Sequence, residues 1–377
     1  MNQSVAILWV HFGPYHVARL DALRSRCNVT AIQFAQSQEK YGWSMDRSLD
    51  LVSLSSAAHE RSSLGCALWK LWRVLNTGRP RILMIPGYQE PLALAAAMWG
   101  RLHGRINILM SDSTFCDRPR TSWKEKAKRF VASSLFQAAF VSGSRAESYL
   151  RSLGYHAPSL ETGYDVVDNN YFETRVAQIR SEGGKPQRQP FLFVGRLDPV
   201  KNLHLLIESF GAYRKDGGRR TLKIVGTGPQ DREIREMAAK RGLSEAIHFA
   251  GYQNYSQLPA HYARAQCLIL PSLSEPWGLV VNEAMASGLP VIVSDRCGCA
   301  DELVYPGNNG FVFPAEDGSA LVDCLHRMDS LTSQQWDAMV LCSQRMVASF
   351  SPQTWAEAVG RLVDKCLEEG SRCTAAA

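Results

Sequence analysis

Two glutamates stand in a stretch of the sequence that is otherwise built from apolar or small residues. The stretch SLSEPWGLVVNEAMASGLPVIVSD runs from Ser272 to Asp295, and seven residues separate Glu275 from Glu283 within it. A buried carboxylate needs hydrogen-bond donors, and the hydroxyls of a sugar or a ribose are donors that come in vicinal pairs. The two carboxylates therefore predict a site for sugar hydroxyls.

Two cations follow another apolar run, FLFVG, in the sequence RLDPVKN. Arg196 comes directly after that run, and Lys201 opens the next predicted helix. Two cations beside a helix N-terminus form an anion site that suits phosphate, with a pair of ordinary surface side chains as the alternative. Phosphate-binding cations and hydroxyl-binding carboxylates together specify a nucleotide sugar, and a dinucleotide is the alternative ligand.

The sequence GTGP (226–229), which begins at Gly226, predicts a tight turn into a helix. It contains G-x-G but lacks the third glycine of the dinucleotide-binding fingerprint. As a signal for a nucleotide it is therefore weak, and a simple turn is the favoured alternative.

The elements that must position these side chains are short β-branched runs that alternate with helical segments. Continuous apolar strands separated by helices indicate parallel sheets covered on both faces. Two such series occur, which predicts an α/β protein with two doubly wound domains. The predicted strands are 5–10, 28–34, 81–85, 106–110 and 138–141 in the first series, and 191–195, 221–226, 246–251, 266–271 and 290–294 in the second.

The segment between the two series contains charge, Gly-Gly and two prolines, which is typical of a linker. The last helical segment carries an apolar stripe at Trp355, Val359, Leu362 and Cys366 that must cover another surface. We therefore predict an N-terminal domain, a linker, a C-terminal domain, and a final helix that packs back on the N-terminal domain; these are residues 1–167, 168–190, 191–350 and 351–377.

In open α/β sheets, ligands bind outside the carboxyl ends of the strands, where helix N-termini point at them. Glu275 lies in the loop after the predicted strand CLILP, and Glu283 lies on the first turns of the helix that follows. Arg196 occupies the corresponding place after its own strand. We expect the strand ends of the two domains to face each other across a cleft, with the linker as the hinge.

The chain has 377 residues, of which 45% are hydrophobic and 21% charged, the profile of a globular protein. Its net charge of +6 suits anionic small ligands or an anionic membrane surface, and we expect no nucleic acid as a partner. No apolar run approaches the roughly 20 residues that a bilayer span needs. Scattered cysteines, and an N-terminus that lacks basic residues and a cleavage site, predict a cytoplasmic protein.

The second half of the chain resembles the donor-binding domain of the family 4 glycosyltransferases, which have the GT-B fold. The resemblance is carried, in the family's order, by FLFVGRLDPVKNLHLLIESF, KIVGTGP, HFAGY and ILPSLSEPWGLVVNEAMASGLPVIVSD. It includes the family's motif of two glutamates with seven residues between them. The N-terminal half resembles the family only in its layout, as expected for an acceptor-binding domain.

The resemblance implies how these residues hold a nucleotide diphosphate sugar. Arg196 and Lys201 match the positions that bind the donor diphosphate. Glu275 matches the position that binds hydroxyls of the transferred sugar, and Glu283 matches the glutamate that binds the ribose hydroxyls. The further donor-binding positions are Gly13, Gly226, Trp277, Gly278 and Leu279.

The chain departs from the family pattern at two places. The family usually has two adjacent glycines where this chain has Gly13-Pro14, and it more often has Gly-Gly before Pro-Glu where this chain has DRCGCADELV. Cys297 and Cys299 thus occupy a loop behind the sugar site, where they can alter the choice of donor. Their spacing is half of a metal site, but without a second pair nearby in the sequence, buried thiols are favoured.

The resemblance implies a retaining enzyme that moves a sugar from a UDP- or GDP-sugar to a hydroxyl of a glycan or lipid-linked acceptor, in bacterial polysaccharide or glycoconjugate biosynthesis. In such a front-face displacement the leaving oxygen accepts the proton, and Arg196 and Lys201 stabilise the departing diphosphate. The chain contains no Asp-x-Asp sequence, so we expect neither a metal nor another cofactor.

Three features of the N-terminal half could have either a functional role or a purely structural one. Asp112 follows the apolar run INILM, where it would orient the acceptor or a sugar hydroxyl; the cap of a short turn is the alternative. His11 and His16 lie near the same rim, and a structural role suits both equally well. The basic segment 118–129, RPRTSWKEKAKR, would touch anionic lipid at the inner face of the plasma membrane, and a solvated helix face is the alternative.

Other functions stay open on the sequence alone. A nucleotide-sugar epimerase of the same fold would need no acceptor, and a phosphorylase would need a lysine that holds pyridoxal phosphate in a far longer chain. Outside the enzymes, the rival is a non-catalytic sugar-nucleotide-binding protein. The joint presence of four charged side chains argues against that rival: Arg196, Lys201, Glu275 and Glu283.

Overall fold

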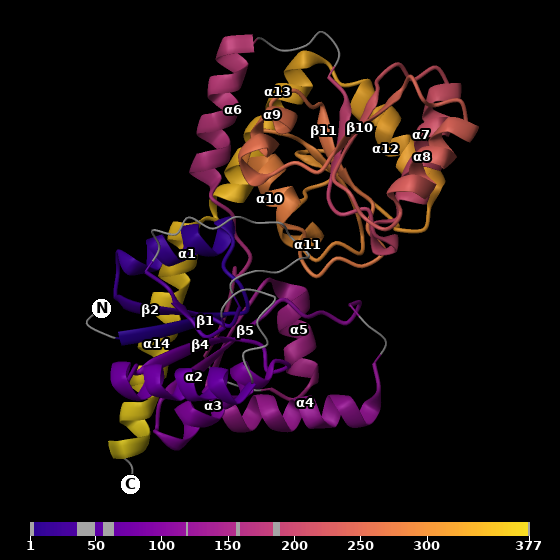
Figure 1. The fold of residues 1–377 in the computed structure, drawn as a ribbon. Coiled ribbons are helices and arrows are strands. Elements are labelled where there is room, and N and C mark those ends of the chain that lie inside the picture. The colour runs from indigo at the N-terminus through magenta and orange to yellow at the C-terminus, as the bar shows by residue number, and fades with distance from the viewer. Residues whose placement is uncertain are drawn as a thin grey trace. The chain divides into compact units, whose positions relative to one another are not determined.

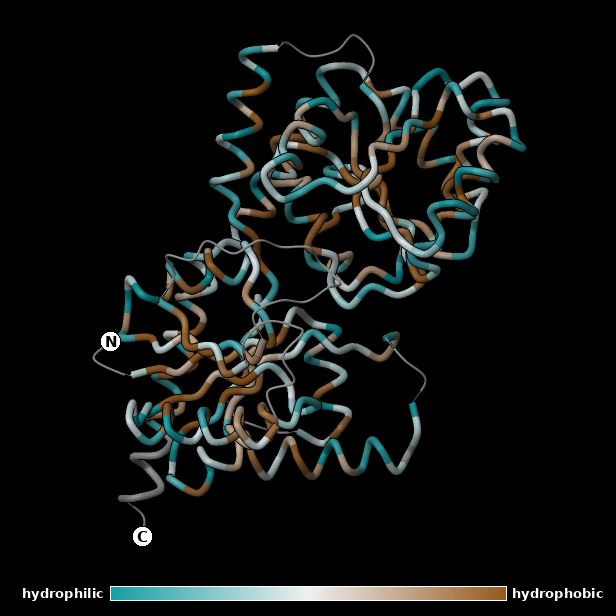
Figure 2. Tube along the Cα trace, viewed as in Figure 1, coloured by the Kyte–Doolittle hydropathy of each residue, from teal (hydrophilic) through white to brown (hydrophobic). Residues whose placement is uncertain are grey.

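The computed structural model describes residues 4–35, 50–55, 64–117, 120–155, 159–183 and 189–375. The chain divides into two compact units (Figure 1): unit 1 consists of residues 1–166 and 352–377, and unit 2 of residues 167–351. Each unit is built around one parallel sheet, and hydrophobic segments form its interior (Figure 2). The predicted α/β class with two doubly wound domains is confirmed.

The sheet of unit 1 has seven strands in the order β3-β2-β1-β4-β5-β6-β7. The predicted apolar runs form its five central strands, whereas the two edge strands were not predicted because one is very short and the other, SLET, is mostly polar. The strands are β1 (Ser4–Trp9), β2 (Asn28–Gln33), β3 (Val52–Ser53), β4 (Ile82–Pro86), β5 (Ile106–Ser111), β6 (Ala138–Val141) and β7 (Ser159–Thr162).

Helices cover both faces of this sheet. One face packs against α2, α3, α4 and α5 through a single hydrophobic cluster, and the other face carries α1 and α14 (Figure 1). No helix in the described part of the chain combines the length and the apolar character that crossing a membrane requires. The helices of unit 1 are α1 (Pro14–Arg24), α2 (Leu64–Gly78), α3 (Pro91–Leu102), α4 (Ser122–Leu135), α5 (Ser144–Ser152) and α14 (Pro352–Ala375).

The final helix, α14, packs on α1, β6 and β7 and so belongs to unit 1. Its Trp355 is fully buried, with ring centroids 6.4 Å from Trp9 and 5.6 Å from Phe140. Arg361 and Lys365 pair with Glu161 of β7 at 3.2 and 2.7 Å. The predicted apolar stripe is buried at all four positions: Trp355, Val359, Leu362 and Cys366.

The sheet of unit 2 has six parallel strands in the order β10-β9-β8-β11-β12-β13. Five of them are the predicted runs, and β13, GFVF, is the sixth. The strands are β8 (Phe191–Val194), β9 (Leu222–Val225), β10 (Ile247–Gly251), β11 (Cys267–Leu270), β12 (Val291–Ser294) and β13 (Gly310–Phe313).

The predicted linker 168–190 is largely helical instead. Residues Asn169–Gly183 form α6, which packs on α9 and α10 inside unit 2 through buried Phe172 and Val176. Because the segment is rich in charged residues and glycines, its sequence did not indicate that Phe172 and Val176 would be buried. The other helical elements of unit 2 are η1 (Pro199–Lys201), α7 (Leu203–Lys215), α8 (Asp231–Lys240), η2 (Tyr255–Gln257), α9 (Leu258–Tyr262), α10 (Leu279–Ala286), α11 (Ala300–Leu303), α12 (Gly318–Asp329) and α13 (Ser333–Ala348).

Candidate active site

The loop after β8 carries the two predicted cations. Arg196 follows the strand directly; its side chain is 40% exposed, and its Nε lies 3.2 Å from Oδ2 of Asp198. Lys201 closes the 3-10 turn η1, and its Nζ forms an ion pair with Oε2 of Glu275. The loop thus presents one cation that is paired across the sheet edge and one that is paired within the loop and partly exposed.

Glu275 lies in the loop after β11, at the same sheet edge. Because β8 and β11 are hydrogen-bonded neighbours in a parallel sheet, their carboxyl ends lie side by side. The backbone N–H of Leu273 donates to the carbonyl of Val200 at 2.8 Å, which joins the two loops directly. Adjacent strands therefore account for the contact between Lys201 and Glu275, two residues that lie far apart in sequence.

Further contacts fix the Glu275 carboxylate. Ser272 Oγ donates to Oε2 of Glu275 at 3.2 Å. The Glu275 backbone donates to the Arg296 carbonyl at 3.3 Å and accepts from the Gly298 N–H at 2.9 Å, so that its chain runs beside the loop after β12. The side chain is 15% exposed, which leaves it accessible to a small ligand.

Helix α10 begins immediately after this loop. Gly278 precedes it with φ 109°, a left-handed conformation that favours glycine, and Leu279 is its first residue. The N–H groups of the first helical turn have no partners within the helix, and the helix dipole favours negative charge there. Trp277 is buried, donates its Nε1–H to Oδ1 of Asn282 on α10 at 2.9 Å, and packs its ring 5.5 Å from that of Phe350.

Glu283 lies on the second turn of α10 and is completely buried. Tyr262 of α9 donates its hydroxyl to Oε2 of Glu283 at 2.5 Å. Burial, and secondarily the negative charge of Glu283, raise the pKa of the neighbouring Tyr255 far above its ordinary value. A buried carboxylate of this kind is stabilised by hydrogen-bond donors, here the Tyr262 hydroxyl.

The turn after β9 packs against the loop that carries Arg196. A Cβ on Gly226 would lie 1.9 Å from the carbonyl oxygen of Gly195, and one on Gly228 would lie 2.5 Å from that of Leu197. The backbone of Leu197 also donates to the Thr227 carbonyl at 3.0 Å. Close packing of two backbones explains both glycines, so the turn supports the cation-bearing loop whether or not it also touches a nucleotide.

Cys297 and Cys299 lie behind Glu275 and are both fully buried. Burial raises the pKa of Cys297 to about 12 and that of Cys299 well above its ordinary value. Cys297 Sγ donates to the Leu270 carbonyl at 3.5 Å. Among the described residues no group of His, Cys, Asp or Glu side chains is placed to hold a metal ion, and the two thiols here act as small packing groups.

Gly298, which lies between the two cysteines, was not singled out from the sequence. A Cβ at this position would lie 1.8 Å from the carbonyl oxygen of Pro276, so only glycine allows the two loops to meet. Tyr262 and Ser272, which contact the two glutamates, also carried no sequence signal, because their partners come from spatial neighbours and not from a motif.

The predicted residues of the N-terminal half belong to unit 1. Gly13 precedes α1 in an extended conformation (φ −127°), which does not require glycine, and its N–H donates to Nδ1 of His16 at 3.0 Å. Burial, followed by the charges of Arg19 and His11, lowers the pKa of His16 well below its ordinary value. His16 thus caps α1 as a neutral imidazole, the structural role that the sequence left open.

His11 is buried, and its pKa is lowered by that burial. Asp112 is exposed directly after β5. The turn that follows it is closed by Asp117, which accepts from the backbone N–H and hydroxyl of Thr114, each at 2.6 Å. Asp112 therefore stays a candidate for a ligand contact in unit 1.

Comparison with known proteins identifies the site-bearing part of the chain. Residues 176–335 match the family model described as "Glycosyl transferases group 1". This segment is similar to the group 1 glycosyl transferases. It contains all four charged residues of the predicted donor site: Arg196, Lys201, Glu275 and Glu283.

Relatives of this segment are named for diverse activities. A GDP-mannose-dependent alpha-(1-6)-phosphatidylinositol monomannoside mannosyltransferase of Mycolicibacterium smegmatis is 32% identical over 245 residues, which cover 62% of this chain and 64% of the relative. Glycogen synthase of Mycobacterium tuberculosis is 32% identical over 181 residues, 47% of this chain and 43% of the relative. The match thus spans less than two thirds of either relative.

Solved structures show that this segment is part of a complete GT-B fold. Sucrose-phosphate synthase from Thermosynechococcus elongatus superposes with a TM-score of 0.75 at 19% identity, covering 98% of this chain and 100% of that one. Anabaena Alr3699/HepE, solved in complex with UDP and glucose, gives a TM-score of 0.74 at 18% identity, covering 97% and 100%. At such identities the likeness establishes the fold alone, and membership of family 4 stays a prediction.

Proposed function

We propose that the protein is a retaining, metal-independent glycosyltransferase that moves a sugar from a nucleotide diphosphate sugar to a hydroxyl of a glycan or lipid-linked acceptor. The proposal is carried by one observation: Lys201 and Glu275 form an ion pair at the ends of adjacent strands, and the loop that carries Glu275 leads into α10 with its buried Glu283. The GDP-mannose dependence of one relative and the UDP and glucose bound to one structural neighbour support a nucleotide sugar as the donor.

In the donor complex, the diphosphate replaces Glu275 as the partner of Lys201. Arg196, which is exposed at the same loop, adds a second cation, and the N–H groups at the start of α10 add donors. Once its ion pair is exchanged, Glu275 accepts hydrogen bonds from hydroxyls of the transferred sugar. The backbone from Trp277 to Leu279 lies near the phosphates in this arrangement.

The ribose occupies the position next to Glu283. The carboxylate keeps Tyr262 as one partner and uses its remaining acceptor capacity for the ribose hydroxyls. The turn at Gly226 supports the cation-bearing loop and approaches the nucleotide through its backbone. The roles of Gly13 at the donor phosphate and of Asp112 at the acceptor stay predictions from the sequence.

The reaction is a front-face displacement at the anomeric carbon. The acceptor hydroxyl attacks from the side on which the diphosphate departs, the bond from carbon to phosphate oxygen breaks, and the hydroxyl proton passes to that leaving oxygen. The products are a glycoside of unchanged anomeric configuration and a nucleoside diphosphate. Arg196 and Lys201 stabilise the charge that grows on the leaving group, so that neither a metal nor another cofactor is required.

The test begins with a thermal-shift screen of UDP, GDP and their common sugars, followed by assays for release of the nucleoside diphosphate with each stabilising donor. We expect Lys201→Ala and Glu275→Ala to lower turnover by at least about a hundredfold, since each removes a charge-assisted contact to the reacting group. The matched controls are Lys240→Ala and Glu236→Ala on α8 of the same unit, which should keep wild-type turnover. Circular dichroism checks that all four variants fold.

Four outcomes would contradict the proposal. Wild-type turnover in a folded Lys201 or Glu275 variant would refute the site. Conversion of a nucleotide sugar into its epimer without any acceptor would identify an epimerase. Loss of activity on dialysis against a chelator, restored by a divalent metal, would refute the metal-independent mechanism; an inverted product anomer in the proton NMR spectrum would refute retention.

A further inference from the structure

Large hydrophobic side chains are exposed in one part of unit 1. Of the thirteen that are exposed among the described residues, eight lie between Leu64 and Phe130. Seven of these eight lie on three helices: Leu64, Trp69 and Trp72 on α2, Met98 and Leu102 on α3, and Trp123 and Phe130 on α4. Exposed aromatic side chains in such number are unusual for a surface that meets only water.

The three helices are neighbours on the same face of the sheet. Helix α2 packs against α3, and α3 packs against α4. On α2 the buried positions Ala67, Leu71 and Leu75 point to the core, so the two tryptophans project from the opposite side. We call the outer side of α2, α3 and α4 the aromatic face.

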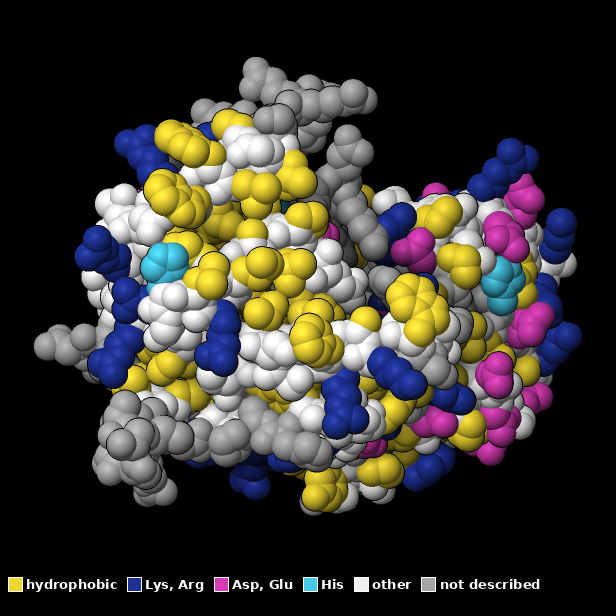
Figure 3. Space-filling model, turned by 90° about the horizontal axis from the view of Figure 1, so that it is seen from below, with side chains coloured by type: hydrophobic (Ala, Val, Ile, Leu, Met, Phe, Trp, Pro, Cys, Tyr) yellow, Lys and Arg dark blue, Asp and Glu magenta, His cyan; other side chains and the backbone are white. Residues whose placement is uncertain are grey.

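The aromatic face is strongly basic. Helices α2, α3 and α4 contain seven Lys or Arg residues and one Glu, which sum to a net charge of +6. The whole chain has the same net charge of +6, so the remaining residues sum to zero. In the view of Figure 3, hydrophobic side chains gather among Lys and Arg side chains, and acidic side chains are concentrated elsewhere.

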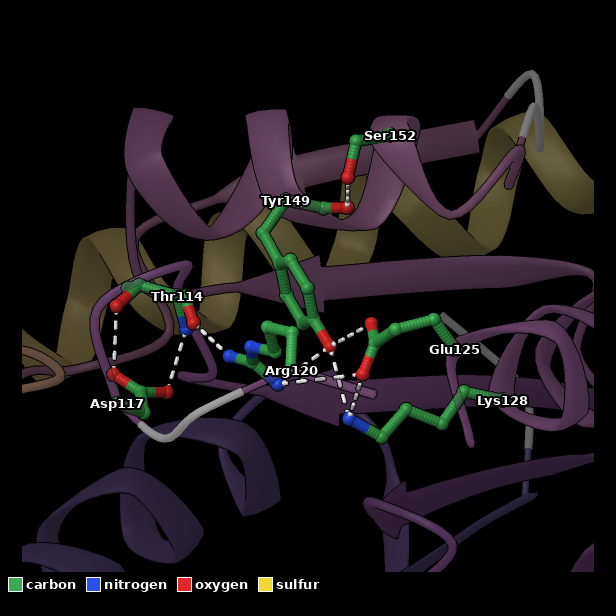
Figure 4. Close-up of polar contacts among 7 residues, drawn as sticks. All are labelled: Thr114, Asp117, Arg120, Glu125, Lys128, Tyr149 and Ser152. Atoms are coloured by element: carbon green, nitrogen blue, oxygen red, sulfur yellow. Dashed lines mark hydrogen bonds and ion pairs between the residues drawn. The ribbon is translucent and has the colours of Figure 1, made fainter. Parts of the chain in front are cut away.

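The one acidic residue of the three helices, Glu125, belongs to a polar cluster that joins α4 to Tyr149 of α5 (Figure 4). Glu125 accepts from Lys128 at 2.7 Å and from the Tyr149 hydroxyl at 2.8 Å, and Arg120 Nη1 lies 3.9 Å from its carboxylate. Arg120 also donates to the Tyr149 hydroxyl at 2.7 Å. The cluster fixes the start of α4 and leaves the cations on its outer side without an acidic neighbour on the helix.

Cations flank the exposed aromatic rings directly. The Arg73 guanidinium lies 5.5 Å from the Trp69 ring centroid, and Lys124 Nζ lies 5.7 Å from that of Trp123. Lys126 is also exposed on α4. Tryptophan prefers the boundary between lipid headgroups and acyl chains, and lysine and arginine beside it attract anionic headgroups.

We propose that the aromatic face docks on an anionic lipid bilayer, with the rings of α2 and α4 in the interface and the cations on the headgroups. Charge complementarity selects this occupant, because a second copy of the chain would bring the same +6 surface against itself. The proposal concerns unit 1 alone and does not depend on sugar transfer, so binding and turnover can fail independently.

The test is co-sedimentation of the purified full chain with vesicles. We expect binding to phosphatidylcholine vesicles that contain phosphatidylglycerol to exceed binding to pure phosphatidylcholine by at least about tenfold. Raising the salt concentration should weaken it, because screening shortens the reach of the charges. Brominated lipid should quench the tryptophan fluorescence of the bound protein.

Two double variants test the cations and the aromatic rings of the surface separately. Lys124→Glu with Lys126→Glu should lower binding to anionic vesicles by about tenfold or more, and Trp72→Ser with Trp123→Ser should lower binding and bromine quenching together. The matched controls carry two charge reversals or two serine substitutions at exposed positions of unit 2: Lys215→Glu with Lys240→Glu, and Tyr305→Ser with Leu341→Ser. Both control variants should bind vesicles as the wild type does.

The proposal is overturned if the wild type binds neither vesicle, binds both equally, or binds as well after the changes on α2 and α4 as before them. It is also overturned if sedimentation velocity shows a dimer that the tryptophan variant dissociates, because the aromatic face would then join two copies of the chain. Circular dichroism of each variant separates a lost surface from a lost fold.

Discussion

At the scale of single residues, the candidate site depends on carboxylates whose partners come from other elements. Glu275 is held by Lys201 and Ser272, and Glu283 by Tyr262. The four charged residues were visible in the sequence because Arg196 and Glu275 lie in the loops after apolar runs, and Lys201 and Glu283 lie in the helical segments that come next. Tyr262 was not, since it lies on a helix of five residues with no motif and contacts Glu283 only through folding. Sequence patterns therefore revealed the charged groups and missed the neutral groups that orient them.

The hydrogen bond from Tyr262 to Glu283 can be tested alone. Tyr262→Phe leaves the ring in place and removes a donor to a buried carboxylate, so we expect the free energy of unfolding to fall by about 1.5–3 kcal/mol. Urea denaturation measures this change. Tyr305→Phe, at an exposed tyrosine, is the control and should be neutral. An unchanged free energy of unfolding in the Tyr262 variant would show that the contact contributes no net stability.

At the scale of elements, apolar runs predicted ten of the thirteen described strands, and the three that were missed lie at sheet edges; one of these, β13 (GFVF), is itself apolar. The central strands of both sheets followed from β-branched runs, whereas β3 and β7 lie at an edge and lack such a run. Helix α6 was mistaken for a linker because only two of its residues, Phe172 and Val176, are buried apolar side chains. Local composition does not reveal a helix whose packing partners, α9 and α10, follow much later in the chain.

Helix α14 is an element whose contribution can be measured. Trp355→Ala removes a buried ring that packs between Trp9 and Phe140, and we expect the free energy of unfolding to fall by about 3–5 kcal/mol. Trp72→Ala, at an exposed position, is the control. Chemical denaturation followed by circular dichroism provides the comparison. Equal midpoints for the two variants would mean that α14 is not integral to unit 1.

At the scale of the whole molecule, the free energy of unfolding should depend on pH through the half-buried His261. Burial, followed by the charges of Lys223 and Arg264, lowers the pKa of His261 to about 4 from 6.5. The unfolded chain then binds a proton that the folded chain does not, so the stabilising contribution is complete above pH 6.5 and is lost as the pH falls towards 4. Acidification within this window should weaken the fold.

The measurement compares urea unfolding at about pH 7 and about pH 5, a range that spans most of this titration. We expect the loss of stability on acidification to be smaller in His261→Gln than in the wild type. His248→Gln, at an exposed position on β10, should show the wild-type loss. If the His261 variant and the wild type lose the same free energy, another group governs the acid response.

The central claim concerns the molecule as a donor-binding enzyme, and the most direct measurement is calorimetric titration of UDP, GDP and their sugars into wild-type protein and into Lys201→Ala. The account predicts that at least one nucleotide diphosphate binds the wild type and that the variant weakens this binding by about tenfold or more, because a charge-assisted contact to the diphosphate is lost. Lys240→Ala should bind as the wild type does. Equal affinity of wild type and Lys201→Ala for every nucleotide would contradict the account.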